Sequence, residues 1–119
     1  MIRYVFVQKF FFIFIKIFNQ LKKYTNMNEV QEYLEKGAVI LDVRTKLEWD
    51  HGHSEGAKHM VLTTIPLHVE EIKSWNKSII AVCKSGGRSE QASQFLSHHG
   101  LDIINGGPWQ NVDNFLGQK

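Results

Sequence analysis

The stretch that decides the fold is SIIAVCKSGGRS, residues 78–89. Its apolar run over 79–82 predicts a short strand that is buried on both faces, as in the middle of a parallel sheet. The chain's single cysteine, Cys83, ends that strand. A tight Ser-Gly-Gly turn follows, and residues 90–96 then have the apolar spacing of an amphipathic helix. The sequence therefore places a thiol at the end of a strand, facing the N-terminus of a helix.

This placement predicts a reactive cysteine. The free amide N–H groups of a glycine-rich turn and of a helix start carry partial positive charge and stabilise anions. Since Arg88 closes the loop and Lys84 is adjacent, Cys83 is expected to have a depressed pKa and to act as a nucleophile at neutral pH. The competing interpretation is that Cys83 is only a small apolar residue at the end of a core strand.

The loop CKSGGRS, residues 83–89, resembles the active-site loop of rhodanese-type sulfurtransferases, whose cysteine carries a persulfide. Counted from Cys83 to Arg88 the loop has six residues, the length that wraps a sulfur-sized anion in this family. The related dual-specificity phosphatases and arsenate reductases have a loop one residue longer. The resemblance implies that Cys83 is catalytic and that the substrate is bound by the rest of the loop: Lys84, Ser85, Gly86, Gly87, Arg88 and Ser89.

The stretches LDVR (41–44), EW (48–49) and GHSEGA (52–57) resemble a second rhodanese signature, which packs behind the catalytic loop. Its charged members follow a predicted buried strand over 38–43, at the sheet edge that also receives Cys83. We interpret these charges as a structural ion-pair network rather than as direct catalysts, because charges at a half-buried edge persist mainly by pairing. Ser54 departs from the family, which usually has an aliphatic residue there. The residues expected around the site are Asp42, Arg44, Glu48, His53 and Trp109, the last as a pocket wall or a core residue.

The rest of the chain alternates strands and helices, which predicts an α/β domain: a three-layer, open parallel sheet flanked by helices and joined by right-handed crossovers. Capping and apolar spacing indicate where the other elements lie. We expect a helix over 28–36 with Val30, Tyr33 and Leu34 buried, a strand over 58–62, a helix from Pro66 to Trp75 with Leu67 buried, a strand over 101–104, a turn over 105–109 and a last helix through about Leu116.

Residues 1–26 differ in composition from the rest. They hold six of the eight Phe residues and five Lys or Arg with no acidic residue. Their apolar run is shorter and more charged than the roughly 20 apolar residues of a membrane-spanning helix. We therefore expect an extension over 1–26 and a rhodanese-like domain over 27–119. Three interpretations of the extension stay open: a misassigned start upstream of Met27, a membrane-surface anchor that contacts lipid through residues 5–18, or a poorly formed signal peptide.

Composition and resemblance together narrow the function. A single cysteine excludes an intramolecular disulfide and any multi-cysteine zinc site, and we expect no cofactor and no metal. Residues 27–119 carry nine basic and twelve acidic side chains, which gives no reason to expect a nucleic-acid partner. The resemblance implies transfer of sulfur from thiosulfate or a persulfide donor, through a Cys83 persulfide, to a thiol or protein acceptor. A cytoplasmic location is expected unless residues 1–26 attach the chain to a membrane or export it.

Two other classes of function use the same features. One is a cysteine-dependent phosphatase or arsenate reductase, which the short loop and the lack of a second cysteine disfavour. The other is a non-enzymatic binding module on the same scaffold, which the presence of Cys83 disfavours. Because fold alone does not assign function, the loop has to decide between them.

Overall fold

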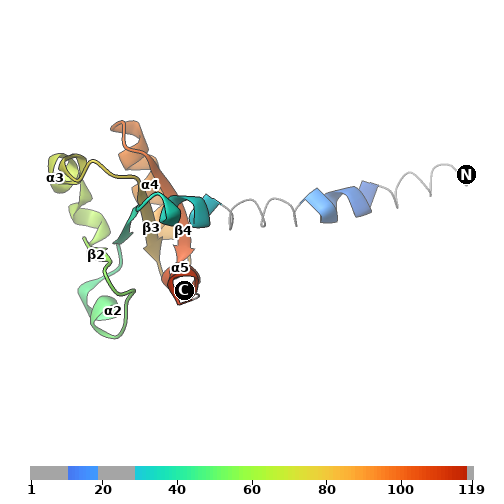
Figure 1. The fold of residues 1–119 in the computed structure, drawn as a ribbon, viewed down its shortest axis with the longest axis horizontal. Helices are drawn as coiled ribbons and strands as arrows, with labels where there is room; N and C mark the ends of the chain where they lie inside the picture. The colour runs from blue at the N-terminus through green and yellow to red at the C-terminus, as the bar shows by residue number, and fades with distance from the viewer. Residues whose placement is uncertain (1–10, 19–28, 118–119) are drawn as a thin grey trace, which may run out of the picture.

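The computed structural model describes residues 11–18 and 29–117, and a four-stranded parallel sheet forms the centre of the second range (Figure 1). The strands are β1 (Val39–Asp42), β2 (Lys58–His59), β3 (Ile79–Cys83) and β4 (Ile103–Pro108). They lie in the order β2-β1-β3-β4, so β3 has a neighbour on each side. All five residues of β3 are buried, as predicted from its apolar run.

Helices cover both faces of the sheet, which confirms the predicted three-layer α/β fold. The helices are α2 (Lys46–Asp50), the 3-10 helix η1 (Leu62–His68), α3 (Val69–Ser74), α4 (Gly87–His98) and α5 (Trp109–Leu116), together with a helical segment over 29–35. The bounds of α4 and α5 agree with the predicted positions of the last two helices.

Alternate residues of β3 contribute to two separate cores. Ile79, Ala81 and Cys83 pack with residues of η1, α3 and α4 on one face of the sheet. The two residues between them face the opposite side, with Val30 of the 29–35 segment and Val112 of α5. This is the two-residue period of a strand. Cys83 therefore ends the strand on the face that α4 covers.

The strand predicted over 58–62 is shorter than expected. β2 holds only Lys58–His59, and η1 begins at Leu62. The backbone N–H of Thr64 donates to the Val61 carbonyl at 2.8 Å, and its hydroxyl donates to the same oxygen at 2.7 Å. The N–H groups of Met60 and Leu62 still donate to the carbonyls of Asp42 and Val43, so the chain follows the edge of β1 until the bonds at Thr64 start the 3-10 helix.

The prediction that a helix starts at Pro66 and buries Leu67 is wrong. Pro66 lies inside η1, and the α-helix begins only at Val69. A 3-10 helix has three residues per turn instead of 3.6, so a different set of side chains faces the sheet. Ile65 is buried, whereas Leu67 is 84% exposed.

The turn predicted over 105–109 is instead the second half of β4, which runs to Pro108 with a register shift opposite Ala81 and Val82. Gly106 permits this path, because a Cβ there would lie 2.5 Å from Ile80 Cγ2. Gly106 and Gly107 therefore mark a bulge in β4, which packs tightly against its neighbours. Asn105, which lies in the predicted turn, is a strand residue paired with Ala81.

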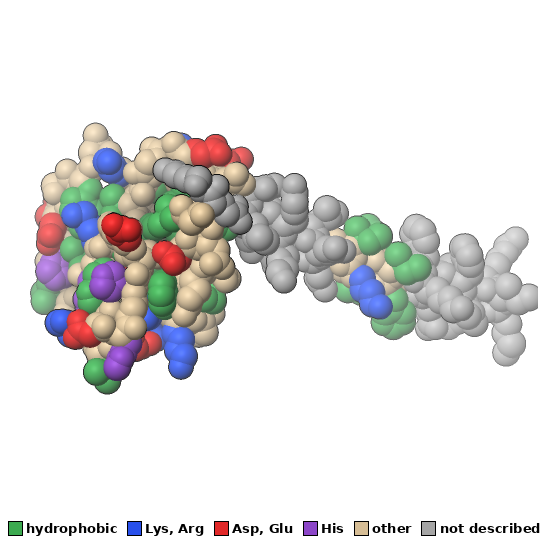
Figure 2. Space-filling view, turned by 60° about the horizontal axis from the view of Figure 1, so that its bottom comes forward, with side chains coloured by type: hydrophobic (Ala, Val, Ile, Leu, Met, Phe, Trp, Pro, Cys, Tyr) green, Lys and Arg blue, Asp and Glu red, His purple; other side chains and the backbone are tan. Residues whose placement is uncertain are grey.

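The described part of the N-terminal extension is a helix over 11–18, whose apolar side chains are exposed. Figure 2 shows an apolar surface on this helix, broken by a basic side chain. Among the described residues, no helix has the length and apolar character needed to cross a membrane. The segment 29–35 buries Val30 and partly buries Tyr33 and Leu34, as predicted. The predictions for residues 5–10, Met27 and Asn28, where the predicted helix over 28–36 starts, lie outside the described residues.

Candidate active site

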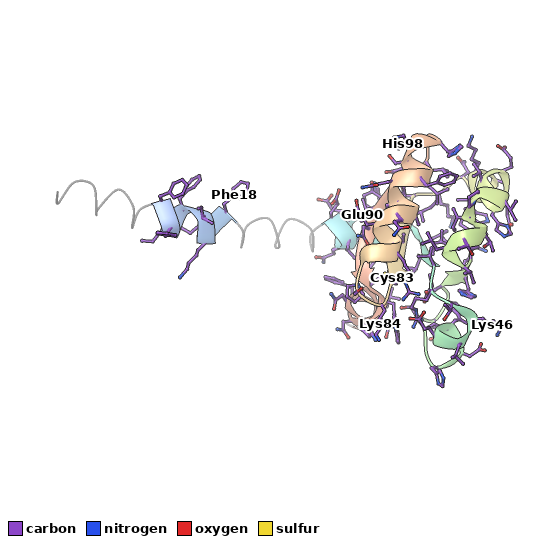
Figure 3. All side chains as sticks on the ribbon, turned by 180° about the vertical axis from the view of Figure 1, so that it is seen from behind. Phe18, Lys46, Cys83, Lys84, Glu90 and His98 are labelled. Carbon is purple, nitrogen blue, oxygen red and sulfur yellow. The ribbon has the colours of Figure 1, made fainter. Side chains whose placement is uncertain are left out.

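The Cys83 sulfur lies at the carboxyl end of β3, at the same end of the molecule as the start of α4 (Figure 3). The Gly86 N–H donates to Sγ at 3.0 Å and the Ser89 N–H at 3.5 Å. The Ser89 hydroxyl oxygen lies 3.3 Å from the sulfur. The loop and the first turn of α4 therefore bring three polar groups to one buried sulfur.

Two opposing effects set the pKa of the Cys83 thiol. Burial raises it, because a thiolate is poorly solvated inside a protein. Hydrogen bonds from the Ser89 hydroxyl and from the amides of Ser89, Gly86 and Ser85 lower it, and together they outweigh burial. The pKa lies below its ordinary value, as expected, but hydrogen bonds rather than nearby cations are the main cause.

Gly86 gives the loop its shape. It is the N-cap of α4 and has a φ of +101°, in the left-handed region that side chains other than glycine rarely adopt. A Cβ at this position would come no closer than 3.5 Å to another residue, so backbone conformation and not space requires glycine. This conformation turns the Gly86 N–H toward the sulfur.

The guanidinium of Arg88 is bound by a carboxylate instead of being available to a substrate at the loop. Its Nη1 and Nη2 donate to the two carboxylate oxygens of Glu48, at 2.6 and 2.9 Å. This pair lowers the pKa of Glu48 to about 2, against a smaller opposing effect of burial. Thr45 adds to it, because its N–H donates to Glu48 Oε1 while its hydroxyl caps α2. Glu48 thus ties α2 to the start of α4.

Asp42 and Arg44 form a second, buried pair. Arg44 Nε donates to Asp42 Oδ1 at 2.9 Å, and Nη2 donates to Oδ2 at 2.7 Å. Arg44 also donates to the backbone carbonyls of Glu48 and Gly52. It therefore fastens the loop after β1 to the sheet edge. The predicted network under the site is present as two ion pairs joined through α2.

His53 and Trp109 lie around this network. The His53 ring stacks on Trp49 with 3.5 Å between ring centroids, and its Nδ1 is 2.8 Å from the Trp49 carbonyl oxygen. The Arg44 guanidinium lies 5.0 Å from the centre of the Trp109 ring. Trp109 packs on the second core and faces Gly52. Both residues support the loop that Arg44 fastens.

The two remaining substrate-binding candidates, Lys84 and Ser85, are exposed at the mouth of the loop, and Gly87 opens α4. Lys84 is thus a solvent-exposed cation that directly follows Cys83 in the chain. Within the described ranges, no three His, Cys, Asp or Glu side chains come together as metal ligands.

Asn105 is the residue that the sequence analysis missed. Its Oδ1 accepts from the Ser89 hydroxyl at 2.7 Å and from the Gly107 N–H at 2.9 Å. Its Nδ2 donates to the Gly86 carbonyl and to Glu90 Oε2, both at 3.0 Å. The signal in the sequence was a polar residue directly after the apolar pair 103–104, but the following glycines suggested a turn.

The fold and the site define a class of proteins: α/β domains in which a cysteine ends the central parallel strand and a short amide-lined loop encloses its sulfur. The model of the Rhodanese-like domain matches residues 26–108, well over half of the chain. The chain belongs to the rhodanese-like domain family.

Individual relatives agree with this assignment. The thiosulfate sulfurtransferase GlpE of Haemophilus influenzae is 28% identical over 73 residues, which cover 61% of this chain and 69% of that protein. A tRNA uridine(34) hydroxylase of Cronobacter sakazakii is 33% identical over 88 residues, but the match covers only 25% of that protein. The crystal structure of a rhodanese-like domain protein from Staphylococcus aureus superposes with a TM-score of 0.58 at 28% identity, covering 73% of this chain and 86% of the other.

Proposed function

We propose that the protein is a sulfurtransferase that carries sulfane sulfur as a persulfide on Cys83. The observation that carries this proposal is the sulfur held by the Gly86 and Ser89 amides at 3.0 and 3.5 Å within a six-residue loop. Such donors stabilise a negative charge on sulfur, whether on the thiolate or on the outer atom of a persulfide. The similarity to a thiosulfate sulfurtransferase over most of that protein's length supports the same chemistry.

The reaction runs in two steps that exchange one sulfur atom. The Cys83 thiolate attacks the outer sulfur of thiosulfate, a new S–S bond forms, and sulfite leaves with the electron pair of the bond that breaks. A thiolate of a small molecule or protein, or cyanide, then attacks the outer sulfur of the persulfide. Cys83 leaves as a thiolate and is ready for another donor.

The charges around the loop favour a small anionic donor. Lys84, next to Cys83 in the chain, is exposed and can attract such a donor, whereas the charge of Arg88 is largely balanced by Glu48. The excess of acidic side chains over 27–119 speaks against tRNA as the substrate of this chain. We propose a cytoplasmic location, with membrane contact only through the apolar helix 11–18.

Intact-mass measurement after thiosulfate treatment tests the proposal. The full chain should gain the mass of one sulfur atom, and Cys83→Ser should abolish the gain because Cys83 is the chain's single cysteine. Treatment with cyanide should then remove the added mass and produce thiocyanate, which would show that the sulfur can be transferred to an acceptor. A mass unchanged by thiosulfate and by persulfide donors would contradict the proposal and favour a binding module. Hydrolysis of an aryl phosphate at a comparable rate would favour the phosphatase class.

A further inference from the structure

Asn105 of β4 holds two of the residues that contact the sulfur, Gly86 and Ser89. Its Nδ2 binds the carbonyl of Gly86, whose N–H is 3.0 Å from Cys83 Sγ. Its Oδ1 binds the hydroxyl of Ser89, whose oxygen is 3.3 Å from the same sulfur. The Asn105 side chain, on the strand next to β3, is thus connected to the sulfur through Gly86 and, separately, through Ser89.

The orientation of the Asn105 amide is fixed by its four partners. Nδ2 faces two groups that only accept, the Gly86 carbonyl and the Glu90 carboxylate. Oδ1 faces the Gly107 N–H, which only donates. Turning the amide over would place oxygen against two oxygens and NH2 against an N–H, so Oδ1 must be the atom that meets Ser89.

The Ser89 hydroxyl has one proton and two neighbours that can take it. Oδ1 of Asn105 is 2.7 Å away and cannot donate, so this contact is favourable only when the Ser89 proton lies between the two oxygens. The Ser89 oxygen then presents a lone pair to Cys83 at 3.3 Å. In this orientation the lone pair suits a protonated thiol. The Ser89 hydroxyl lowers the thiol pKa only in its other orientation, in which it donates to the thiolate.

We propose that Asn105 is a positioning residue that competes with the Cys83 sulfur for the single proton of Ser89 and so restrains the reactivity of the cysteine. In the resting state the Cys83 thiol donates a hydrogen bond to the Ser89 oxygen, and the Ser89 hydroxyl donates one to Asn105 Oδ1. When the thiol proton is lost to solvent, the hydroxyl rotates to the sulfur, and Asn105 Oδ1 keeps the Gly107 N–H. The inference rests on the proposed role of Cys83 as the nucleophile.

Other charges act on the same sulfur and have to be separated from this effect. Arg88 and its partner Glu48 lie on one side. Glu90 contacts Asn105 directly, and Glu29 and His98 line the same hollow behind it. The fields of these groups act on the sulfur whether or not residue 89 carries a hydroxyl. A double-mutant cycle through Ser89 therefore cancels them to first order.

The experiment measures the alkylation rate of Cys83 against pH in the full-length protein and in Asn105→Leu, Ser89→Ala and the double variant. Asn105→Leu frees the Ser89 proton for the thiolate. At a pH below the thiol pKa, Asn105→Leu should therefore increase the thiolate population of the protein that has Ser89. This increase should be up to about tenfold larger than the increase that Asn105→Leu causes in the Ser89→Ala protein. Asn105→Leu also loosens the turn at Gly86, but it does so with Ser89 and with Ala at position 89 alike, so this effect cancels in the comparison. Equal effects in the two backgrounds, or coupling of the opposite sign, would overturn the proposal.

Two additions keep the result interpretable. Gln94→Leu removes the other side-chain bond to Glu90, at 3.2 Å, without touching Ser89, and it should leave the alkylation profile unchanged; a shift as large as that of Asn105→Leu would contradict the proposal. If Asn105→Leu does not fold by circular dichroism, the same cycle is run with Asn105→Ala. Coupling without sulfur loading by thiosulfate would count against the sulfurtransferase proposal alone.

Discussion

The pKa of the Cys83 thiol is lowered mainly by hydrogen bonds, and Arg88, at the end of its loop, is half of an ion pair with Glu48. The positive charge of Arg88 acts on the sulfur only weakly, because both of its outer nitrogens bind Glu48, at 2.6 and 2.9 Å. The strength of the cation at the site is therefore set by a residue 40 positions earlier in the chain.

Substitutions of the two partners should move the reactivity of Cys83 in opposite directions. Glu48→Gln leaves Arg88 with an unbalanced charge, so the pKa of the thiol should fall further and the KM for thiosulfate should decrease. Arg88→Ala leaves the Glu48 carboxylate unpaired, so the thiol pKa and the KM should rise. Alkylation rate against pH and initial-rate kinetics measure the two effects. Profiles that coincide with the wild type would mean that the amides alone control the thiolate.

The same pair makes stability depend on acid pH. The pKa of Glu48 is about 2 in the folded protein, below its ordinary value of 4.5. The contribution is therefore fully present above about pH 4.5 and is lost as pH falls toward 2. Because both side chains are partly exposed, we expect about 1 kcal/mol rather than the full linkage value. Urea unfolding at several pH values should show that the free energy of unfolding of Glu48→Gln falls less steeply between pH 4.5 and 2 than that of the wild type. An equally steep fall would mean that other groups cause the acid sensitivity.

Ser54 is a buried polar residue whose hydroxyl has no hydrogen-bond partner among the described residues. The family resemblance suggests an aliphatic residue at this position, and Ser54→Ala removes a polar group that burial penalises. We expect the free energy of unfolding to rise by about 1 kcal/mol. Ser97→Ala, at an exposed position on α4, is the matched control and should change little. Destabilisation by Ser54→Ala would show that the hydroxyl is satisfied in solution.

At the level of elements, the parts of the fold with a strong local pattern were predictable. β3 reads as a buried strand because its apolar run has no interruption, and the CKSGGRS loop identifies the start of α4. β2 and η1 were not predictable in detail, since the turn at Thr64 depends on the bonds that its N–H and its hydroxyl both make to the Val61 carbonyl. The role of Asn105 was hidden for a related reason: it depends on pairing with Ala81, far away in the sequence, and the glycines that follow Asn105 are as typical of a turn as of a bulged strand.

The bulge in β4 should be intolerant of a side chain at Gly106. A Cβ there would lie 2.5 Å from Ile80 Cγ2 and 2.9 Å from Val112 Cγ2, so β4 or α5 must move. We expect Gly106→Ala to lower the free energy of unfolding by about 1–3 kcal/mol. Gly117→Ala serves as the control, because its nearest contact would be an ordinary 3.7 Å. Equal denaturation midpoints for the two variants would contradict the tight packing of β4 against α5.

At the level of the whole chain, both cores are built from residues downstream of the extension. The buried members of the two clusters run from Val30 to Val112, and the described helix 11–18 contributes none of them. Its apolar side chains are exposed instead, among them Phe12 at 64% and Phe14 at 60%. An exposed apolar surface of this kind favours lipid contact or association over solubility.

A chain truncated to begin at Met27 should therefore fold and work without residues 1–26. We expect the same thermal midpoint within error and the same sulfur loading by thiosulfate, because the loop, the two ion pairs and Asn105 all lie within 42–105. The truncated chain should also be more soluble and should no longer sediment with anionic vesicles if the extension binds lipid. Phe14→Glu in the full-length chain is the matched control, since it charges the apolar helix and leaves every residue of the domain in place. A truncated chain that aggregates or loses its cooperative melt, while the Phe14→Glu protein does not, would show that the extension is part of the fold.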